Sequence, residues 1–284
     1  MPSTPWTKPD TSTRPIAVIG GGVMGQRIAM MWIASGFTVI LCEKVLDYGN
    51  AVSYIQEHEG EQAAKQGTQP AELKTTTSLE EAAGNAWMVI EAIPEKLDLK
   101  IELMTQLDKI APTDCIIASN SSSLRSSQMI VNTEKNYRIC NGHYYMPPEQ
   151  TYYELMSCGY TDPEIFPFLM EKAKQAGFKP VHARSESTGL VFNRIWASIK
   201  REILLVLADG VTDAHTVDEM FKSWFQATKG PCQMMDTVGL DTVYNIEVVY
   251  TQQRGLDSKV TDWLKANYVD KGNLGAKSGT GLLG

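Results

Sequence analysis

The amino-acid sequence predicts an α/β protein, in which a doubly wound parallel sheet is followed by an all-helical C-terminal domain. Short apolar runs alternate with helical patterns over residues 15–120, as in parallel sheets whose strands are connected by crossover helices. After residue 187 the strand patterns stop and only helical patterns continue. The chain has 284 residues, of which 43% are hydrophobic and 21% charged. This composition is typical of a globular protein with one large or two modest domains.

The first part of the chain alternates strand-like and helical segments. The strand patterns are short apolar runs that cover residues 15–20, 37–43, 86–93 and 114–120. The helical patterns, with apolar residues at three- and four-residue spacing, cover residues 23–36, 47–66 and 95–110. Because strands and helices alternate in the βαβ order, these segments predict a Rossmann-type doubly wound sheet.

The second part of the chain changes from strands to helices. Strand patterns at residues 137–145, 152–158 and 178–184 flank one helical pattern at residues 163–176. Further helical patterns cover residues 188–210, 216–227, 237–254 and 259–268. We therefore expect three regions. They are a disordered polar tail over residues 1–14, a Rossmann domain over residues 15–186 and a helical domain over residues 187–284.

Composition excludes several classes of function. A net charge of −7 at pH 7 does not favour nucleic acid or an anionic membrane as a partner. No apolar run reaches the ~20 residues of a membrane span. The polar tail resembles neither a signal peptide nor an Arg-rich transit helix, so we expect a cytoplasmic protein. The five cysteines are odd in number and lack CxxC spacing, which predicts reduced thiols and no metal site.

A glycine-rich turn joins the first predicted strand to the first predicted helix. Gly20, Gly22 and Gly25 have the spacing G-x-G-x-x-G. The first glycine permits a tight turn, the second leaves room for a pyrophosphate, and the third lets helix and strand pack closely. The N-terminus of the helix then faces the phosphates. We predict a dinucleotide site at this turn, formed by Gly20, Gly21, Gly22, Val23, Met24 and Gly25.

Glu43 closes the second predicted strand, eighteen residues after Gly25. A carboxylate at this place can accept hydrogen bonds from the adenosine ribose and repel a 2′-phosphate, which favours NAD over NADP. Lys44 follows it directly, and its positive charge weakens this preference for NAD. FAD is the alternative dinucleotide, and a glycine turn that binds no dinucleotide is the structural alternative.

His143 is the candidate for a catalytic base. It lies at the end of a strand-like run after the nucleotide-binding segments, where doubly wound sheets open onto their ligand crevice. The near-neutral pKa of an imidazole suits proton transfer at physiological pH. A histidine that only satisfies its hydrogen bonds at a strand end is the structural alternative.

Three further polar residues accompany this histidine. Glu154 lies in an otherwise apolar run, where a carboxylate is costly unless it is paired. Pairing with His143 would raise the imidazole pKa and hold one tautomer. Ser122 follows a strand and can reach a substrate oxygen or the nicotinamide, although a helix N-cap would also explain it. Asn193 begins the long helix near an apolar face.

Together these residues resemble the 3-hydroxyacyl-CoA dehydrogenase family, including its L-gulonate and carnitine dehydrogenase relatives, over nearly the whole chain. The matching segments, in order, are VIGGGVMGQRIA, IEAIPEKLDLKIEL, ASNSSSL, GHYYMPPEQTYYELM, GLVFNRI and GPCQMMDTVGLDT. The resemblance places Glu95 and Lys100, from the second segment, in the NAD pocket. It also implies a homodimer formed through the helical domain.

The resemblance implies a reaction as well. The expected activity is the NAD-dependent interconversion of a 3-hydroxyacyl compound, as thioester or free acid, and its 3-keto form. His143 would take the hydroxyl proton while hydride passes to NAD, and Glu154 would orient His143. Ser122 and Asn193 would hydrogen-bond the reacting oxygens, and Ser122 would also contact the nicotinamide.

The chain departs from the family pattern around the substrate. Met146 stands where the family usually has asparagine, and Glu154 follows His143 by eleven residues instead of the usual twelve. Residues 56–67 (QEHEGEQAAKQG) are acidic, with Lys65 as their one basic residue, which disfavours a polyanion such as CoA. The candidate residues that shape the substrate pocket are Met146, Tyr144 and Tyr145.

Two alternatives to a dehydrogenase stay open. The chain could be a repurposed member that binds NAD(H) and acts on a specialised metabolite, or binds it without net redox turnover. It could also be a structural protein that keeps the fold without catalysis. Binding of NADH without turnover would favour the first alternative, and failure to bind any dinucleotide would favour the second.

Overall fold

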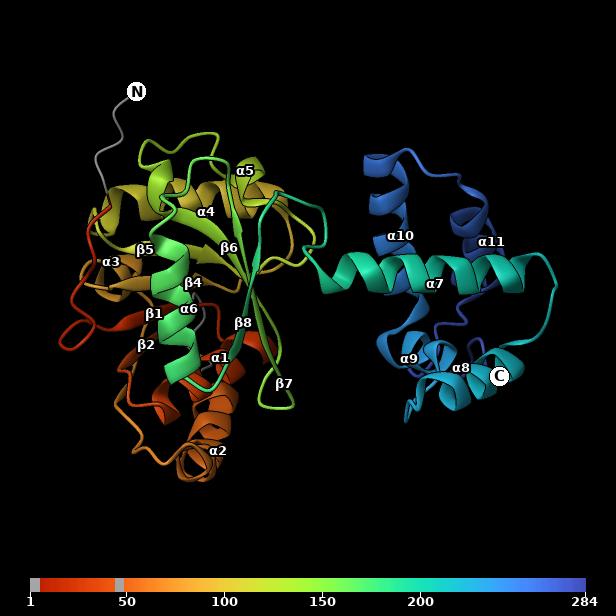
Figure 1. The fold of residues 1–284 in the computed structure, drawn as a ribbon, viewed down its shortest axis with the longest axis horizontal. Coiled ribbons are helices and arrows are strands. Elements are labelled where there is room, and N and C mark those ends of the chain that lie inside the picture. Colours follow the sequence, from red (N-terminus) through yellow and green to blue (C-terminus); the bar gives the residue numbers. More distant parts are fainter. Residues whose placement is uncertain (1–5, 44–48) are drawn as a thin grey trace. The chain divides into compact units, whose positions relative to one another are not determined.

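The computed structural model describes residues 6–43 and 49–284, which divide into two compact units (Figure 1). The first unit is Met1–Val191 and the second is Phe192–Gly284. The first contains a sheet with helices and the second contains helices, so the predicted fold class is confirmed. In the described part of the chain, no helix is both long and apolar enough to cross a membrane.

The sheet of the first unit has eight strands in the order β3-β2-β1-β4-β5-β6-β7-β8 (Figure 1). Their bounds are β1 Ile16–Ile19, β2 Val39–Cys42, β3 Leu73–Thr76, β4 Met88–Glu91, β5 Ile116–Ser119, β6 Ile139–Met146, β7 Gln150–Ser157 and β8 Lys179–Ala183. All neighbouring strands are parallel except β6 and β7, which form an antiparallel hairpin. β1 to β6 therefore end together at one edge of the sheet, whereas β7 and β8 run in the opposite direction.

Helices cover both faces of this sheet. Their bounds are α1 Val23–Ala34, α2 Gly49–Gln66, α3 Leu79–Ala83, α4 Leu97–Ile110, α5 Ser126–Met129 and α6 Ile165–Gln175. Side chains alternate between the faces of a strand. Ile16 and Val18 pack in one apolar cluster with α1 and α6, while Ala17 and Ile19 pack in a second cluster with α3 and α4. Burial on both faces explains why the strands are continuous apolar runs.

The second unit is built from helices around its own core. Their bounds are α7 Phe192–Ala208, α8 Ala214–Phe225, α9 Pro231–Val238, α10 Leu240–Arg254 and α11 Lys259–Asn267. The core gathers fully buried side chains from four of these helices: Leu204, Met235, Leu240 and Leu264. Asp213 caps α8 by accepting a hydrogen bond from the backbone N–H of Thr216 at 2.9 Å, as its position before a helical pattern favours.

The structure adds elements that the sequence patterns did not predict. β3 is an edge strand with the sequence LKTT, and only Thr76 in it is buried, so it lacks the apolar run of the other strands. α9 was not predicted, and the helix predicted over residues 237–254 begins only at Leu240, because the chain turns at Gly239 with φ +103°. The helix predicted over residues 47–66 begins at Gly49, and residues 47 and 48 lie outside the described residues.

The expectation of a disordered tail is wrong for residues 6–14. Trp6 is only 7% exposed, and its indole Nε1 donates a hydrogen bond to the carbonyl of Asp114 at 2.8 Å. Its ring packs edge-on against Phe168, with 5.2 Å between centroids. One buried tryptophan supplies enough apolar contact to order a polar segment. Residues 1–5 lie outside the described residues.

Candidate active site

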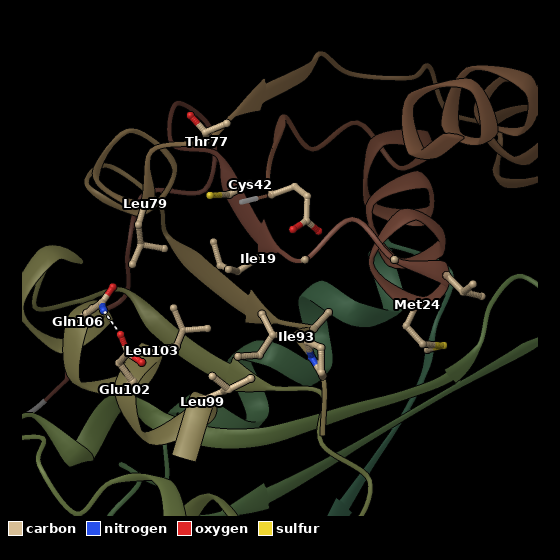
Figure 2. Close-up of a pocket in the computed structure, with 16 residues that line it drawn as sticks. Ile19, Met24, Cys42, Thr77, Leu79, Ile93, Leu99, Glu102, Leu103 and Gln106 are labelled. Atoms are coloured by element: carbon tan, nitrogen blue, oxygen red, sulfur yellow. Dashed lines mark hydrogen bonds between the residues drawn. The ribbon is translucent and has the colours of Figure 1, made fainter. Parts of the chain in front are cut away.

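A cavity of the first unit opens at the carboxyl edge of strands β1 and β4. The chain leaves β1 toward β2 on one side, and β4 lies on the other side of β1, so a crevice forms where the strand order reverses. This cavity has a volume of about 680 Å³. Apolar side chains from β1 and from the β4–α4 connection and α4 point into it: Ile19, Ile93, Leu99 and Leu103 (Figure 2).

The glycine turn after β1 leaves room for a phosphate at one wall of this cavity. Gly20 has φ +107°, a conformation that favours glycine. A Cβ on Gly25 would lie 1.8 Å from the carbonyl oxygen of Gly20, whereas a Cβ on Gly22 would meet no atom within 4 Å. Gly22 also caps α1 without a side-chain hydrogen bond. The helix N-terminus is thus open toward the cavity, and these residues fit a pyrophosphate.

Glu43 lies at the mouth of the same cavity, directly after β2. Its carboxylate oxygen Oε2 accepts a hydrogen bond from the backbone N–H of Gly21 at 2.7 Å. The turn therefore holds the carboxylate in place beside the space that a pyrophosphate would occupy, where a ribose hydroxyl would donate to it. Lys44 lies outside the described residues. Cavity, glycine turn and carboxylate together fit the adenosine and pyrophosphate of NAD.

A buried ion pair joins α4 to the sheet behind the cavity. Lys100 is 1% exposed and Glu91 is 0% exposed, and the Lys100 Nζ lies 2.6 Å from Glu91 Oε1. Ser119 donates to the other Glu91 oxygen at 2.5 Å. Removing one partner of such a pair costs about 3–5 kcal/mol, because the other charge stays buried without compensation. The pair therefore fixes where α4 meets the ends of β4 and β5.

Glu95 extends this network toward the surface. It accepts hydrogen bonds from the hydroxyls of Ser121 and Ser123, and Lys100 Nζ lies 3.3 Å from its Oε2. Burial by itself raises the pKa of Glu95. The Lys100 ammonium and the serine hydrogen bonds outweigh burial and hold the pKa below its ordinary value. Glu95 thus keeps a negative charge near the carboxyl ends of β4 and β5.

His143 lines a second cavity, of about 230 Å³, together with Ser122, Glu95 and Lys100. Three residues line both cavities: Met24, Ala92 and Ile93. The second cavity therefore adjoins the dinucleotide cavity. The structure brings together seven residues that the sequence predicted for the site, which are Met24, Glu95, Lys100, Ser122, His143, Tyr144 and Tyr145.

The imidazole of His143 is enclosed. It is 6% exposed, and its ring meets that of Tyr145 edge-on with 4.6 Å between centroids. The Nδ1 atom has no hydrogen-bond partner among the described residues. Burial lowers the pKa of His143 to about 4, and the negative charge of Glu95 opposes that shift. The ring is therefore neutral at physiological pH.

Glu154 lies directly opposite His143 in the β6–β7 hairpin. Directly opposed residues of antiparallel strands place their side chains on one face of the sheet. Glu154 is 3% exposed, and its Oε2 accepts a hydrogen bond from the backbone N–H of Val191 at 2.9 Å. The net pKa of His143 is lowered and not raised, because burial of the ring outweighs the opposing carboxylate charge of Glu95; the pairing of Glu154 with His143 stays a prediction.

The interval of eleven residues does not move Glu154 away from His143. The strand register shifts between Tyr144 and Met146. A bulge therefore lies between the His143–Glu154 pair and the hairpin turn. Bulges absorb one residue locally and leave the pairing beyond them intact. His143 and Glu154 therefore stay directly opposite each other despite the shorter interval.

The remaining predicted residues lie in different surroundings. Tyr144 points away from His143 along the strand, and its ring is buried in the core, where its hydroxyl accepts a hydrogen bond from Trp32 Nε1 at 3.1 Å. Met146 is 43% exposed and does not line the His143 cavity. Of the three predicted pocket residues, Tyr144 and Tyr145 line the His143 cavity, and Tyr145 has its ring beside His143. Asn193 belongs to α7 of the second unit.

Sequence reasoning missed Glu91 and Ser119. The signal was present, because Glu91 is a carboxylate inside the apolar run of residues 86–93, where burial requires a partner. The partner could not be identified, since lysines are frequent in helices and Ser119 is distant in the sequence. In the described part of the chain no group of His, Cys, Asp and Glu is arranged to hold a metal ion, and the five cysteines are buried and unbonded.

Two family profiles together match almost the whole chain. The profile described as 3-hydroxyacyl-CoA dehydrogenase, NAD binding domain, matches residues 15–187. The profile described as 3-hydroxyacyl-CoA dehydrogenase, C-terminal domain, matches residues 189–283.

Individual proteins match as well. The 3-hydroxybutyryl-CoA dehydrogenase of Clostridioides difficile is 30% identical over 280 residues, which cover 94% of this chain and 98% of that protein. The 3-hydroxyacyl-CoA dehydrogenase-like protein LAM1 of Cochliobolus heterostrophus is 48% identical over 146 residues, or 51% of this chain and 31% of its own length. This chain therefore matches under a third of LAM1. A solved diketoreductase structure is 31% identical, with a TM-score of 0.77 and coverage of 95% and 98%.

Proposed function

Because this chain belongs to the 3-hydroxyacyl-CoA dehydrogenase family, with its NAD-binding domain, we propose that it interconverts a small 3-hydroxyacyl compound and its 3-keto form. NAD, when bound, accepts the hydride at its nicotinamide. One observation carries this proposal. His143, Ser122 and Glu95 line a cavity that adjoins the dinucleotide cavity and shares three of its residues, so a substrate there would lie beside the nicotinamide.

His143 is the proposed proton acceptor. The buried ring is neutral at physiological pH, because burial lowers its pKa to about 4, and a neutral imidazole can take the proton of a substrate hydroxyl. The cation that forms is then stabilised by nearby carboxylates. Glu95 acts on it through its charge, and Glu154 lies across the strand pair. In the reverse direction the same proton returns to the oxygen of the reduced keto group.

Ser122 and Asn193 are the proposed binding groups for the reacting oxygens, and Glu154 is the proposed positioning residue. The Ser122 side chain lines the His143 cavity. Asn193 lies in the first turn of α7, two residues after Val191, whose backbone N–H donates a hydrogen bond to Glu154 Oε2. The backbone at the junction of the units is thus tied to the carboxylate opposite His143.

The charge of α2 favours a substrate without a CoA nucleotide. This helix carries acidic side chains along residues 57–61, and its basic residue Lys65 is engaged with Glu61 at 2.7 Å. An acidic helix repels the phosphates of CoA. We therefore extend the proposal to free 3-hydroxy acids and short thioesters as the preferred substrates.

The test is NADH formation with three forms of one substrate: 3-hydroxybutyryl-CoA, its N-acetylcysteamine thioester and free 3-hydroxybutyrate. Wild type is compared with His143→Ala, and with His215→Ala as a matched control, since His215 is exposed on the second unit. His143→Ala should lower kcat/KM by roughly 10²–10⁴-fold, the usual contribution of a general base. The control should keep the wild-type rate.

Each outcome bears on a separate part of the proposal. Equal rates of wild type and His143→Ala would contradict the role of His143. A kcat/KM for the CoA thioester well above that of the short thioester would contradict the substrate preference and leave the reaction intact. Binding of NADH without turnover of any of the three compounds would favour a repurposed family member.

A further inference from the structure

The second unit contains a polar cavity of its own. It has a volume of about 220 Å³ and is lined by residues of α7 and α10 and by Leu256. All residues that line it belong to the second unit. Its polar groups come from both helices, and those that matter here are Arg201 on α7 and Glu247, Tyr250 and Arg254 on α10.

Two buried polar atoms in this cavity have no partner. Glu247 is 1% exposed, and Arg201 Nη1 lies 3.4 Å from its Oε2, but its Oε1 has no hydrogen-bond partner among the described residues. Tyr250 is 3% exposed, and within the same described residues its hydroxyl has no partner either. Buried polar atoms are nearly always hydrogen-bonded, because desolvation without a partner is costly. Such atoms in a cavity wall indicate a ligand that supplies the missing hydrogen bonds.

Three basic side chains act on the Glu247 carboxylate, and Glu202 also lines the cavity. Lys200, Arg201 and Arg254 oppose the rise in the pKa of Glu247 that burial causes. Arg201 is engaged with Glu247, the Thr251 hydroxyl and the carbonyl of Asp257. Arg254 instead packs over the Tyr250 ring, 5.8 Å from its centroid. Its guanidinium is exposed at the mouth of the cavity, where it can bind a carboxylate with two parallel hydrogen bonds.

We propose that this cavity binds a small hydroxycarboxylate. The carboxylate of the ligand pairs with Arg254, and its hydroxyl donates to Glu247 Oε1 and accepts from the Tyr250 hydroxyl. A cavity of about 220 Å³ corresponds to the volume of about seven water molecules at ~30 Å³ each, which is the size of a four-carbon hydroxy acid. The site is separate from His143, whose cavity belongs to the first unit.

The test uses calorimetric titration of the full chain with malate and with succinate, which differ only in the hydroxyl group. We expect malate to bind about tenfold more tightly than succinate, since a hydrogen bond to a charged group contributes at least that much. Tyr250→Phe should reduce this preference for malate. Arg254→Ala should weaken the binding of both acids about tenfold or more, while its matched control Arg184→Ala, an exposed arginine of the first unit, should bind them as wild type does.

Two further measurements locate the binding. His143→Ala should keep the malate affinity of wild type, because it leaves the second unit unchanged. Arg254 is exposed, so Arg254→Ala should give the wild-type circular dichroism spectrum. Equal affinity for malate and succinate would overturn the proposal, as would loss of malate binding in His143→Ala or its survival in Arg254→Ala. Absence of malate binding in wild type, including through coverage of the cavity by a second copy, would overturn it as well.

Discussion

Among single residues, His143 is both the proposed proton acceptor and a buried side chain. A histidine in water has a pKa near 6.5, so half of it would be charged at slightly acidic pH. Burial in the cavity lowers that pKa to about 4 and keeps the ring neutral. The same burial that suits the ring to accept a proton makes the folded chain sensitive to acid, because the unfolded chain binds a proton on this residue more readily.

This sensitivity gives a prediction for stability. Between pH 6.5 and about 4 the unfolded chain is protonated at His143 while the folded chain is not, so the free energy of unfolding falls as the pH falls through this window. The contribution of His143 is fully present above pH 6.5. Roughly 3 kcal/mol of it is lost once the pH is below the folded pKa. The measurement is urea unfolding at a series of pH values without NAD.

The comparison variants are His143→Gln and His215→Gln. His143→Gln cannot titrate, so its free energy of unfolding should fall less steeply between pH 6.5 and 4 than that of wild type. His215→Gln, at an exposed position, should follow wild type. Parallel pH curves for wild type and His143→Gln would show that His143 does not lose its proton affinity on folding.

Among the elements, the turn from β1 to α1 is where backbone geometry and cofactor binding meet. The roles of Gly20, Gly22 and Gly25 were predictable from the sequence, because a missing side chain is a local property of the backbone. The structure separates two of these roles. A Cβ on Gly25 would meet the Gly20 carbonyl, so Gly25 is needed for the fold; a Cβ on Gly22 would meet only open space, so we predict that Gly22 matters for the ligand alone.

Three alanine substitutions test this separation. Gly22→Ala should keep the wild-type free energy of unfolding and weaken NAD binding at least about tenfold, because the added methyl group takes space that a phosphate requires. Gly25→Ala should unfold at lower urea concentration, since its Cβ would lie 1.8 Å from a carbonyl oxygen. Gly60→Ala, in α2 with no atom within 4 Å of its Cβ, is the control and should bind NAD normally.

The measurements are NAD titration by calorimetry and urea unfolding of each variant. Wild-type NAD affinity in Gly22→Ala would mean that the phosphates do not approach this turn. Wild-type stability in Gly25→Ala would mean that the close contact between helix and strand can relax at no cost.

At the scale of the whole molecule, the second unit carries exposed apolar side chains on α8. Met220 is 67% exposed, Trp224 85% and Phe225 64%. Exposed aromatic and methionine side chains that cluster on one helix mark interaction surfaces. The family resemblance implies a homodimer through the helical domain, and we predict that α8 contributes to it.

Sedimentation equilibrium measures this prediction. Wild type should sediment with about twice the mass of a 31.4 kDa chain. Trp224→Glu should raise the dimer dissociation constant by about tenfold or more, as loss of a central interface residue does. Tyr160→Glu, which changes an equally exposed aromatic residue of the first unit, 69% exposed, should dimerise like wild type. A monomeric wild type, or a Trp224→Glu variant with unchanged dimerisation, would contradict the assignment.

The sequence by itself determined the order of strands and helices, the glycine turn and the residue types of the candidate site. These features depend on local periodicity and on backbone sterics, which a single segment expresses without its neighbours. It did not determine β3, whose four residues lack an apolar run, or the ordering of residues 6–14, which depends on the packing of Trp6 against Phe168.

Only the tertiary structure decided which side chains meet. The pairing of Glu91 with Lys100, the position of Glu154 opposite His143 and the unpartnered atoms between α7 and α10 all join segments that approach one another through packing. The pKa of His143 belongs to the same class, because it reflects how completely the folded chain encloses the ring. Residue types in a sequence give the reactive groups, whereas burial and partners, which set their charge, arise only when distant segments pack.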